Sequence, residues 1–338
     1  MDHFKILKRA FGITWNYRVL WVFGVLLALT TTSPRGGSSA GGGGGGGGNG
    51  GGGLNPPGDF HLPELSPEWI NGLITAGIVL ACLILLSIVL GVILRYASET
   101  ALIRMVDLHE ATGEKIGVRQ GMRLGLTRPA LRIFLVDLLF GLGGLVAFIL
   151  LMLIAAAPLL VWLIESEPLR IVGTITAVGL ILLVILLAIV VAAALSLVTH
   201  FIRRTIVLEN LGVFEGIRRG FALVRQRLGD TVIMWILMIA LGLAFAVLMI
   251  PVILVLILAG VVIGGLPGLL VGWLASLAAE GPAPWIAGAA IGVPIFLAVL
   301  IVPALFLSGL VEVFKSSTWT LTYREVTALQ TIQAETPA

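Results

Sequence analysis

Charged side chains are scarce in this sequence, and cysteine is almost missing from it. Asp, Glu, Lys and Arg make up 12% of the 338 residues, about half of the ~25% that is usual for soluble domains. So few charges could not keep a chain with 58% hydrophobic residues in solution. Cys82, the single cysteine, cannot support a disulfide framework or a cysteine zinc site. These absences exclude a soluble domain and predict an all-α protein that crosses a membrane several times.

Residue patterns that carry chemistry are also missing. No two of the four histidines have the spacing of metal ligands, and no HExxH run occurs. The glycine-rich stretch lacks the Lys and Ser/Thr that a phosphate-binding loop carries at fixed offsets. Asp137 is the one ionisable residue well inside an apolar run, and we expect it to cap a helix or pair with an arginine of another elbow helix. We therefore predict no catalytic, cofactor-binding or metal-binding residues and no enzymatic activity.

Six apolar runs form the main pattern of the chain. A bilayer crossing needs about 20 apolar residues, and interfacial aromatic residues extend the shorter first run. We expect one membrane domain, residues 1–330, with a C-terminal tail at 331–338 and a disordered, glycine-rich outer loop at 33–67. The predicted spans are 19–32, 69–94, 131–157, 171–198, 231–258 and 285–310. The run that contains the third span passes Pro158, so it either tilts or breaks there.

The segment 259–279 has more than one interpretation. It is apolar and carries glycine at four-residue steps, from Gly260 to Gly272. Such a stripe can form a close helix-packing face. The same glycines weaken a helix, which favours a re-entrant or surface-lying segment, the interpretation we prefer. A seventh span is a further alternative, but it would place Lys315 and Arg324 on the outer side.

A polar interval between the fourth and fifth spans predicts an amphipathic helix. Phe214, Ile217, Phe221, Val224 and Leu228 follow a 3-4-3-4 spacing and therefore share one helical face. Arginines flank that face, which is typical of a helix lying in a membrane interface. We call such segments elbow helices. We expect lipid-headgroup contacts from the following basic residues of three elbows: Lys8, Arg9, Arg119, Arg123, Arg218, Arg219, Arg225 and Arg227.

The elbows recur, which indicates a threefold internal repeat. The segments 6–11, 121–126 and 216–221 share a similar order of aliphatic, basic, small and aromatic or aliphatic residues, and each precedes an odd-numbered span. The even-numbered spans are followed by similar segments, which begin at Thr100, Thr205 and Thr318. We therefore predict a helical bundle of six spans, built as three repeated hairpins with cytoplasmic elbow helices.

One of these elbows carries a resemblance to a known family. The segment from Val207 to Leu223 reads VLENLGVFEGIRRGFAL. It resembles the signature of the glycerophosphoryl diester phosphodiesterase membrane-domain family and related six-span bacterial proteins, with Gly216 for the usual Ala and Gly220 for the usual Ser. The resemblance implies an integral membrane domain whose own activity is not established. In some relatives the phosphodiesterase is a separate soluble barrel, and no segment of this chain fits such a barrel.

The distribution of basic residues predicts the orientation and the partners. All of the 21 Lys and Arg residues except Arg35 and Arg170 fall on the side of the N-terminus in this layout. This asymmetry predicts cytoplasmic termini in a bacterial inner membrane. The basic residues border apolar runs and do not form a soluble basic surface with stacking aromatics, so we expect no nucleic-acid partner. We expect a protein that organises anionic lipid or partner proteins at the inner face, with a small-solute transporter or channel as the alternative.

Overall fold

The computed structural model describes residues 2–31, 67–163, 166–278 and 281–335. These residues fold into helices without any strand, which confirms the all-α prediction for the part described. The predicted glycine-rich loop lies outside the described residues apart from its last position, since α3 begins at Pro67. The elements are α1 (His3–Asn16), α2 (Val19–Thr31), α3 (Pro67–Thr112), α4 (Val118–Gly125), α5 (Arg128–Ala156), η1 (Ala157–Leu163), α6 (Glu167–Leu208), α7 (Val213–Gln226), α8 (Leu228–Ser276) and α9 (Ala283–Glu335).

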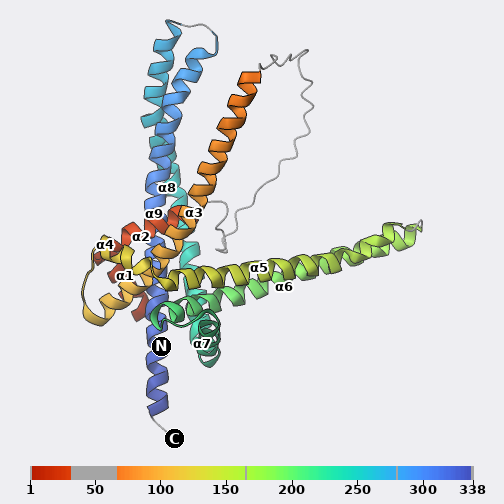
Figure 1. The fold of residues 1–338 in the computed structure, drawn as a ribbon, viewed down its shortest axis with the longest axis vertical. Coiled ribbons are helices and arrows are strands. Elements are labelled where there is room, and N and C mark those ends of the chain that lie inside the picture. The colour runs from red at the N-terminus through yellow and green to blue at the C-terminus, as the bar shows by residue number, and fades with distance from the viewer. Residues whose placement is uncertain (1, 32–66, 164–165, 279–280, 336–338) are drawn as a thin grey trace.

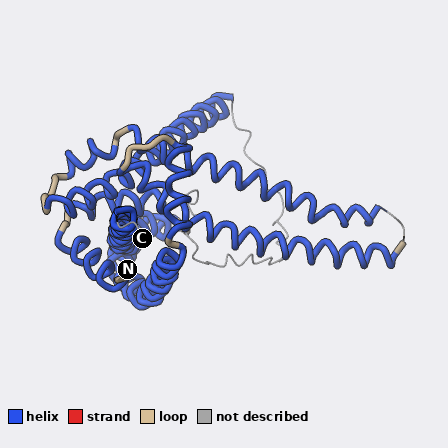
Figure 2. Tube along the Cα trace, turned by 90° about the horizontal axis from the view of Figure 1, so that it is seen from below, coloured by secondary structure: helices blue, strands red, loops and turns tan. Residues whose placement is uncertain are grey.

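Three apolar arms diverge from a packed hub (Figure 1). The α8–α9 arm (239–308) stands along the long axis, the α3 arm (67–94) rises obliquely beside it, and the α5–α6 arm (141–194) points sideways. Figure 2 shows the α5–α6 arm again projecting away from the remaining helices. The hub contains α1, α2, α4 and α7 with the inner ends of the long helices, at 95–112, 128–140, 195–208, 228–238 and 309–335.

The arms have almost no protein around them. At most 6% of the residues in the most apolar window of any long helix are buried inside the protein. In water, such large exposed apolar surfaces would associate, whereas lipid tails solvate them. Five described helices are long and apolar enough to cross a membrane, and the bent pair α1–α2 raises the number to six if it counts as one span. The chain is therefore a multi-pass membrane protein.

The first predicted span is shorter in the structure than a bilayer crossing requires. The α2 helix has 13 residues and meets α1 at a bend of 99°. At 1.5 Å per residue it is about 20 Å long, while the hydrocarbon core is about 30 Å thick. The helix packs between α3 and α9 and buries Leu20, Phe23 and Leu27 in the hub. Its described part is consequently a hub helix and does not by itself span a membrane.

Residues 259–276 of this segment belong to α8, which does not fit our preference for a re-entrant or surface-lying segment. The helix continues through Pro251 and Pro267 to Ser276. Its glycines lie against α9 so closely that a Cβ on Gly264 would be 2.7 Å from the carbonyl oxygen of Gly292. The close-packing interpretation was therefore the right one. Contact with α9 outweighs the weak helix propensity of glycine, because the two backbones gain dispersion contacts along the whole stripe.

The α8–α9 arm is longer than one bilayer. Residues 239–276 of α8 form an uninterrupted helix of about 57 Å. A tilt of about 60° would be needed to fit this length into a hydrocarbon core of ~30 Å, while tilts of membrane helices stay within about 40°. The outer part of this arm therefore extends beyond the hydrocarbon core of a single bilayer.

Other predicted boundaries agree with the structure in part. The α3 helix ends at Thr112, where Gly113 takes a positive φ of 74°, and α5 gives way to η1 next to Pro158, as the break there predicted. The helix of the fifth predicted span begins three residues early, since α8 begins at Leu228 and carries Asp230 in its first turn. The last residues were expected to be a tail, yet α9 continues to Glu335.

The hub is held by elbow contacts that close into a ring. The α4 helix packs on α3, α7 packs on α6, and α1 packs on α9. The first two contacts depend on glycine, since a Cβ on Gly125 would lie 2.2 Å from the carbonyl oxygen of Ala97, and one on Gly220 would lie 2.8 Å from Cγ1 of Ile202. At the corner between α1 and α2, the Tyr17 hydroxyl donates to the carbonyl of Ile116 (2.8 Å) and accepts from its N–H (2.7 Å). Burial raises the pKa of Tyr17, so its hydroxyl remains a donor at neutral pH.

Substituting Gly125 tests the contact between α4 and α3. We expect Gly125→Ala to lower the free energy of unfolding by about 1–3 kcal/mol, because the new methyl group meets a backbone carbonyl that cannot rotate away. The matched control is Gly12→Ala in α1, where nothing lies within 4 Å of the added Cβ. That change should stabilise the protein by about 0.5–1 kcal/mol, since alanine favours the helix. Unfolding titrations in mixed micelles measure both, and equal effects at the two positions would contradict the close approach.

Candidate functional site

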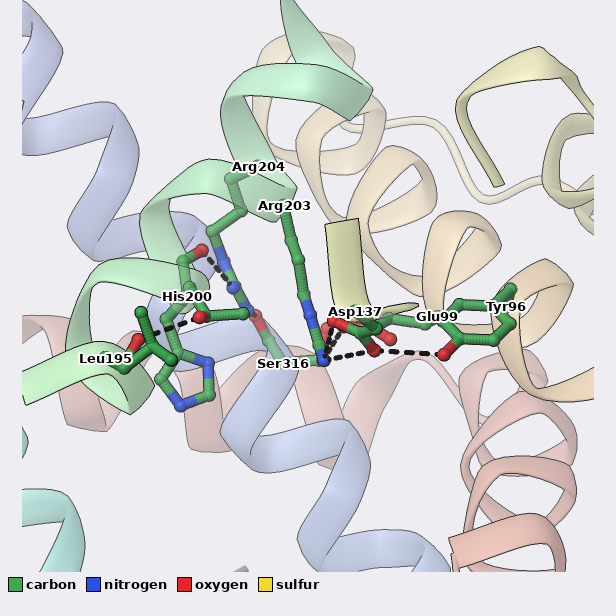
Figure 3. Close-up of polar contacts among 9 residues, drawn as sticks. Tyr96, Glu99, Asp137, Leu195, His200, Arg203, Arg204 and Ser316 are labelled. Carbon is green, nitrogen blue, oxygen red and sulfur yellow. Dashed lines mark hydrogen bonds and ion pairs between the residues drawn. The ribbon is translucent and has the colours of Figure 1, made fainter. Parts of the chain in front are cut away.

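A buried ion-pair cluster lies where α3, α5 and α6 enter the hub (Figure 3). Arg203 of α6 donates from Nη1 to Oε1 of Glu99 at 2.7 Å. Its Nη2 donates to both carboxylate oxygens of Asp137, at 2.8 and 2.7 Å. The Tyr96 hydroxyl completes this Arg203 cluster with a hydrogen bond of 3.0 Å to Asp137. The side chains of Arg203, Glu99 and Asp137 are only 16%, 12% and 18% exposed, so the charges are largely withdrawn from water.

Arg204, the next residue, points to the other side of α6 and joins it to α9. Its Nη1 donates to the carbonyl of His200 at 2.6 Å, and its Nη2 donates to the carbonyl of Ser316 at 3.3 Å (Figure 3). The His200 ring stacks on Trp319 with 4.6 Å between ring centroids. The adjacent arginines thus connect α6 to three other helices of the hub.

The Arg203 cluster joins α6 to α3 and α5 through hydrogen-bonded ion pairs. Both carboxylates accept hydrogen bonds from Arg203, and Asp137 also accepts one from Tyr96. These charge-assisted hydrogen bonds hold the side chains of α3, α5 and α6 in one arrangement. In the part of the chain that the structure describes, no group of three or more His, Cys, Asp or Glu residues is arranged to hold a metal ion.

Asp137 pairs with an arginine, as one of the two alternatives for it predicted, but the arginine belongs to the inner end of α6 and not to an elbow helix. Reasoning from the sequence missed Glu99 and Arg203 as a pair. The available signal was their position in the sequence. Glu99 is the first acidic residue after the apolar run 69–94, and Arg203 is one of the first basic residues after the apolar run 171–198. Such a position predicts the depth of a charge in the membrane but not its partner.

The predicted headgroup residues divide into two groups. Arg9 pairs with Glu110, Arg219 lies 3.7 Å from Glu209, and Arg227 lies 3.8 Å from Asp230. The others are exposed, and among the described residues they have no ion pair or hydrogen bond through their charged groups: Lys8, Arg119, Arg123, Arg218 and Arg225. We call these the free elbow cations.

The apolar face predicted for α7 is divided in the structure. Val224 is buried in the hub together with the glycine side of the helix, at Gly216 and Gly220. Phe214 and Phe221 are exposed, at 79% and 54%. The helix therefore packs through its small residues and leaves its aromatic side chains on the outside.

The α1 helix has the same division. It buries Ile6, Ala10 and Ile13 in the hub, and it exposes Phe4, Phe11 and Trp15. Phe11 and Trp15 stack with 6.3 Å between their ring centroids. Two elbows thus present aromatic side chains beside exposed cations.

A shallow hollow opens on the hub between the inner ends of α3, α6 and α9. It has a volume of about 350 Å³, and its polar lining includes Asp107, Glu209, Tyr323 and Arg324. These groups are engaged with one another, since Arg324 donates to Asp107 at 2.6 Å and Tyr323 donates to Glu209 at 2.5 Å. Most polar groups that line the hollow therefore already have hydrogen-bond partners, so few of them are available to a ligand.

Comparison with known proteins adds a family but no function. No curated protein and no solved structure matches the chain significantly. One family model, described as a family of unknown function (DUF7544), matches residues 14–323, from the end of α1 to the hub part of α9. This description does not test the resemblance to the glycerophosphoryl diester phosphodiesterase membrane-domain family, which stays a prediction. Because the match covers all three arms and nearly the whole hub, the chain belongs to the family of unknown function DUF7544.

Proposed function

We propose that this protein has no enzymatic activity of its own and organises anionic lipid, or partner proteins, at the inner face of a bacterial cytoplasmic membrane. The observation that carries this proposal is the set of free elbow cations next to exposed apolar side chains. A cation that has no carboxylate partner in the protein is available to a lipid phosphate. Each such residue near an anionic surface contributes about 1 kcal/mol to the attraction.

The ring of elbow contacts supports the threefold repeat. In this proposal one unit consists of an elbow helix and the hairpin that follows it. The α4 and α7 helices each pack on the returning helix of the preceding unit, and α1 packs on the returning helix of the last unit. Equivalent contacts at equivalent places are what repeated units would produce. The repeat would place the three elbows around one centre.

The orientation rests on the distribution of charge around the hub. Among the described Lys and Arg residues, only Arg170 lies at the far end of an arm, and the remainder lie in the hub. The N-terminus also lies at the hub, and the C-terminal end of α9 extends from the hub on the side opposite the α8–α9 arm (Figure 1). By the positive-inside rule, the hub and both termini are cytoplasmic.

The alternative, a transporter or channel, would require polar side chains that face one another between the arms. In the arms, Ser87 donates to the carbonyl of Ile84 at 2.7 Å, and Thr176 donates to that of Val172 at 2.8 Å. These hydroxyl groups are satisfied within their own helices. Asp137 belongs to the Arg203 cluster. The arrangement therefore favours lipid organisation over a solute path.

The retained lipid shell tests the proposal. The protein is reconstituted in equal amounts of phosphatidylglycerol and phosphatidylcholine, extracted in mild detergent, and its bound lipids are quantified by mass spectrometry. We expect phosphatidylglycerol to be enriched in the wild type. The enrichment should fall strongly in a variant with five substitutions, Lys8→Gln, Arg119→Gln, Arg123→Gln, Arg218→Gln and Arg225→Gln, because their attraction to the anionic headgroup is removed.

The paired arginines provide the control. A variant with Arg9→Gln, Arg219→Gln and Arg227→Gln should keep most of the enrichment, because Glu110, Glu209 and Asp230 already balance these charges. Equal lipid ratios in the wild type and the five-substitution variant would disprove the role of the free elbow cations. High salt should weaken the preference, since it screens exposed charges.

A further inference from the structure

One arginine at the membrane end of the hub differs from the others. The first basic residues at the inner ends of the long apolar helices include Arg95, Arg132, Arg203, Arg227 and Lys315. Arg132 donates to the carbonyl of Asn210 at 2.7 Å, and Lys315 donates to Glu312 at 3.0 Å. Arg203 and Arg227 pair with acids. Within the described residues, Arg95 has no oxygen partner, and its guanidinium carbon lies 5.7 Å from the centroid of the Tyr96 ring.

The position of Arg95 relates it to the gap between two arms. It lies four residues before Glu99 and therefore on the same face of α3, one turn closer to the arm. Glu99 faces Arg203 of α6, so that face looks toward the α5–α6 arm. Beyond this level the α3 arm and the α5–α6 arm separate (Figure 1). Arg95 therefore lies on the side of α3 that faces the α5–α6 arm, and we call the region between these two diverging arms the wedge.

The wall of the wedge on α3 is apolar. Val92, Ile88 and Ile84 precede Arg95 by three, seven and eleven residues, so they continue its face along the arm. They are 37%, 41% and 50% exposed, without protein to cover them. A molecule that fills this wedge has a charged or polar end at Arg95 and a long apolar part beside α3. A phospholipid of the inner leaflet has this form.

The positive charge of Arg95 favours a lipid with a negatively charged headgroup. Glu99 and Asp137 offset Arg203 and the adjacent Arg204, which leaves the charge of Arg95 uncompensated. A guanidinium group binds the two oxygens of a phosphate through parallel hydrogen bonds. We infer that Arg95 binds the phosphate of an anionic glycerophospholipid whose acyl chains occupy the wedge between the α3 arm and the α5–α6 arm. This inference deepens the proposed function and rests on it for the orientation of the hub, but it concerns a separate, single site.

Titration of delipidated full-length protein with phosphatidylglycerol, followed by native mass spectrometry, tests the site. We expect the affinity for the first lipid to fall at least about tenfold in Arg95→Gln, because a charge-assisted contact is lost. Arg95→Lys should recover part of it as a point charge. The control Arg9→Gln removes a cation that Glu110 already balances and should leave the first binding event unchanged. Unaltered affinity in Arg95→Gln, or displacement of the lipid by inorganic phosphate, would overturn the inference.

The result is separable from that of the proposed function. If the five-substitution variant of the elbows keeps the wild-type lipid ratio while Arg95→Gln loses its first lipid, the elbow proposal fails and the Arg95 site stands. The reverse outcome removes the Arg95 site alone. Thermal unfolding of the lipid-free proteins serves as the folding check, and Arg95→Gln should stay close to the wild type because it loses only the contact with the Tyr96 ring and no oxygen partner in the described protein. If Arg95→Gln unfolds at a lower temperature than the wild type, Arg95→Lys replaces it in the titrations. Equal affinities of Arg95→Lys and the wild type, both for lipid and for inorganic phosphate, would then count against the site.

Discussion

Replacing Arg203 with methionine is expected to lower the free energy of unfolding by about 3–5 kcal/mol, the usual cost of leaving buried charges without their partner. Glu99 and Asp137 are 12% and 18% exposed in the folded protein, and both depend on this one guanidinium. Methionine matches the length of the arginine stem, so packing changes little and the loss reports on charge. Titration with a denaturing detergent, followed by tryptophan fluorescence, measures the change.

Neutralising the acids at the same time separates charge from packing. The triple variant Arg203→Met, Glu99→Gln and Asp137→Asn should recover most of the lost stability, because no buried charge is then left alone. Arg218→Gln, an exposed cation without an ion pair in the described structure, is the matched control and should have an effect within about 0.5 kcal/mol. If Arg203→Met has the same free energy of unfolding as this control, the cluster does not hold α3, α5 and α6 together.

Leucine at position 264 is expected to separate the outer halves of α8 and α9, whereas leucine at position 265 should change nothing. A Cβ on Gly264 would lie 2.7 Å from both the carbonyl oxygen of Gly292 and the amide nitrogen of Phe296. Nothing lies within 4 Å of a Cβ on Gly265. The larger side chain therefore has space at one position and meets backbone at its neighbour, and the overpacked helix should lose about 1–3 kcal/mol or more.

The separation can be measured directly by distances between spin labels. Cys82 is the single cysteine and is exposed, so Cys82→Ser gives a background for labels at Leu270→Cys and Ile286→Cys, which are also exposed. In Gly264→Leu the distance between the labels should increase by a few ångströms, because the axes of α8 and α9 move apart toward the ordinary interaxial distance of about 8–10 Å. Gly265→Leu should keep the wild-type distance. An unchanged distance in both variants would show that the glycine stripe does not set the spacing of this arm.

The features that could be predicted from the sequence are those that depend on neighbouring residues. The run of apolar residues determines which segments are helices that lipid can solvate, and Gly113 and Pro158 interrupt them locally. The 3-4-3-4 spacing that begins at Phe214 predicts the amphipathic helix α7, although folding buries Val224 of the predicted face and leaves Phe214 and Phe221 exposed. These signals act within one or two turns of a helix, so one sequence is enough to read them.

The features that could not be predicted depend on partners far away in the chain. Arg203 pairs with Glu99 across 104 residues and with Asp137 across 66 residues. Glycine at 264 is consistent with a loop or with a packing face until Gly292 is placed opposite it. The short α2 helix likewise gains its place in the hub from α3 and α9.

By itself, the sequence determined that this protein is helical, enters a membrane and concentrates its positive charge at one end of its apolar helices, because hydrophobicity and charge are properties of local segments. Only the tertiary structure decided which cations are neutralised, which glycines touch another backbone and which arginine, Arg95, has no oxygen partner among the described residues. The reason is physical: whether a polar or small side chain is satisfied depends on the atoms that folding brings next to it, and those atoms come from other helices.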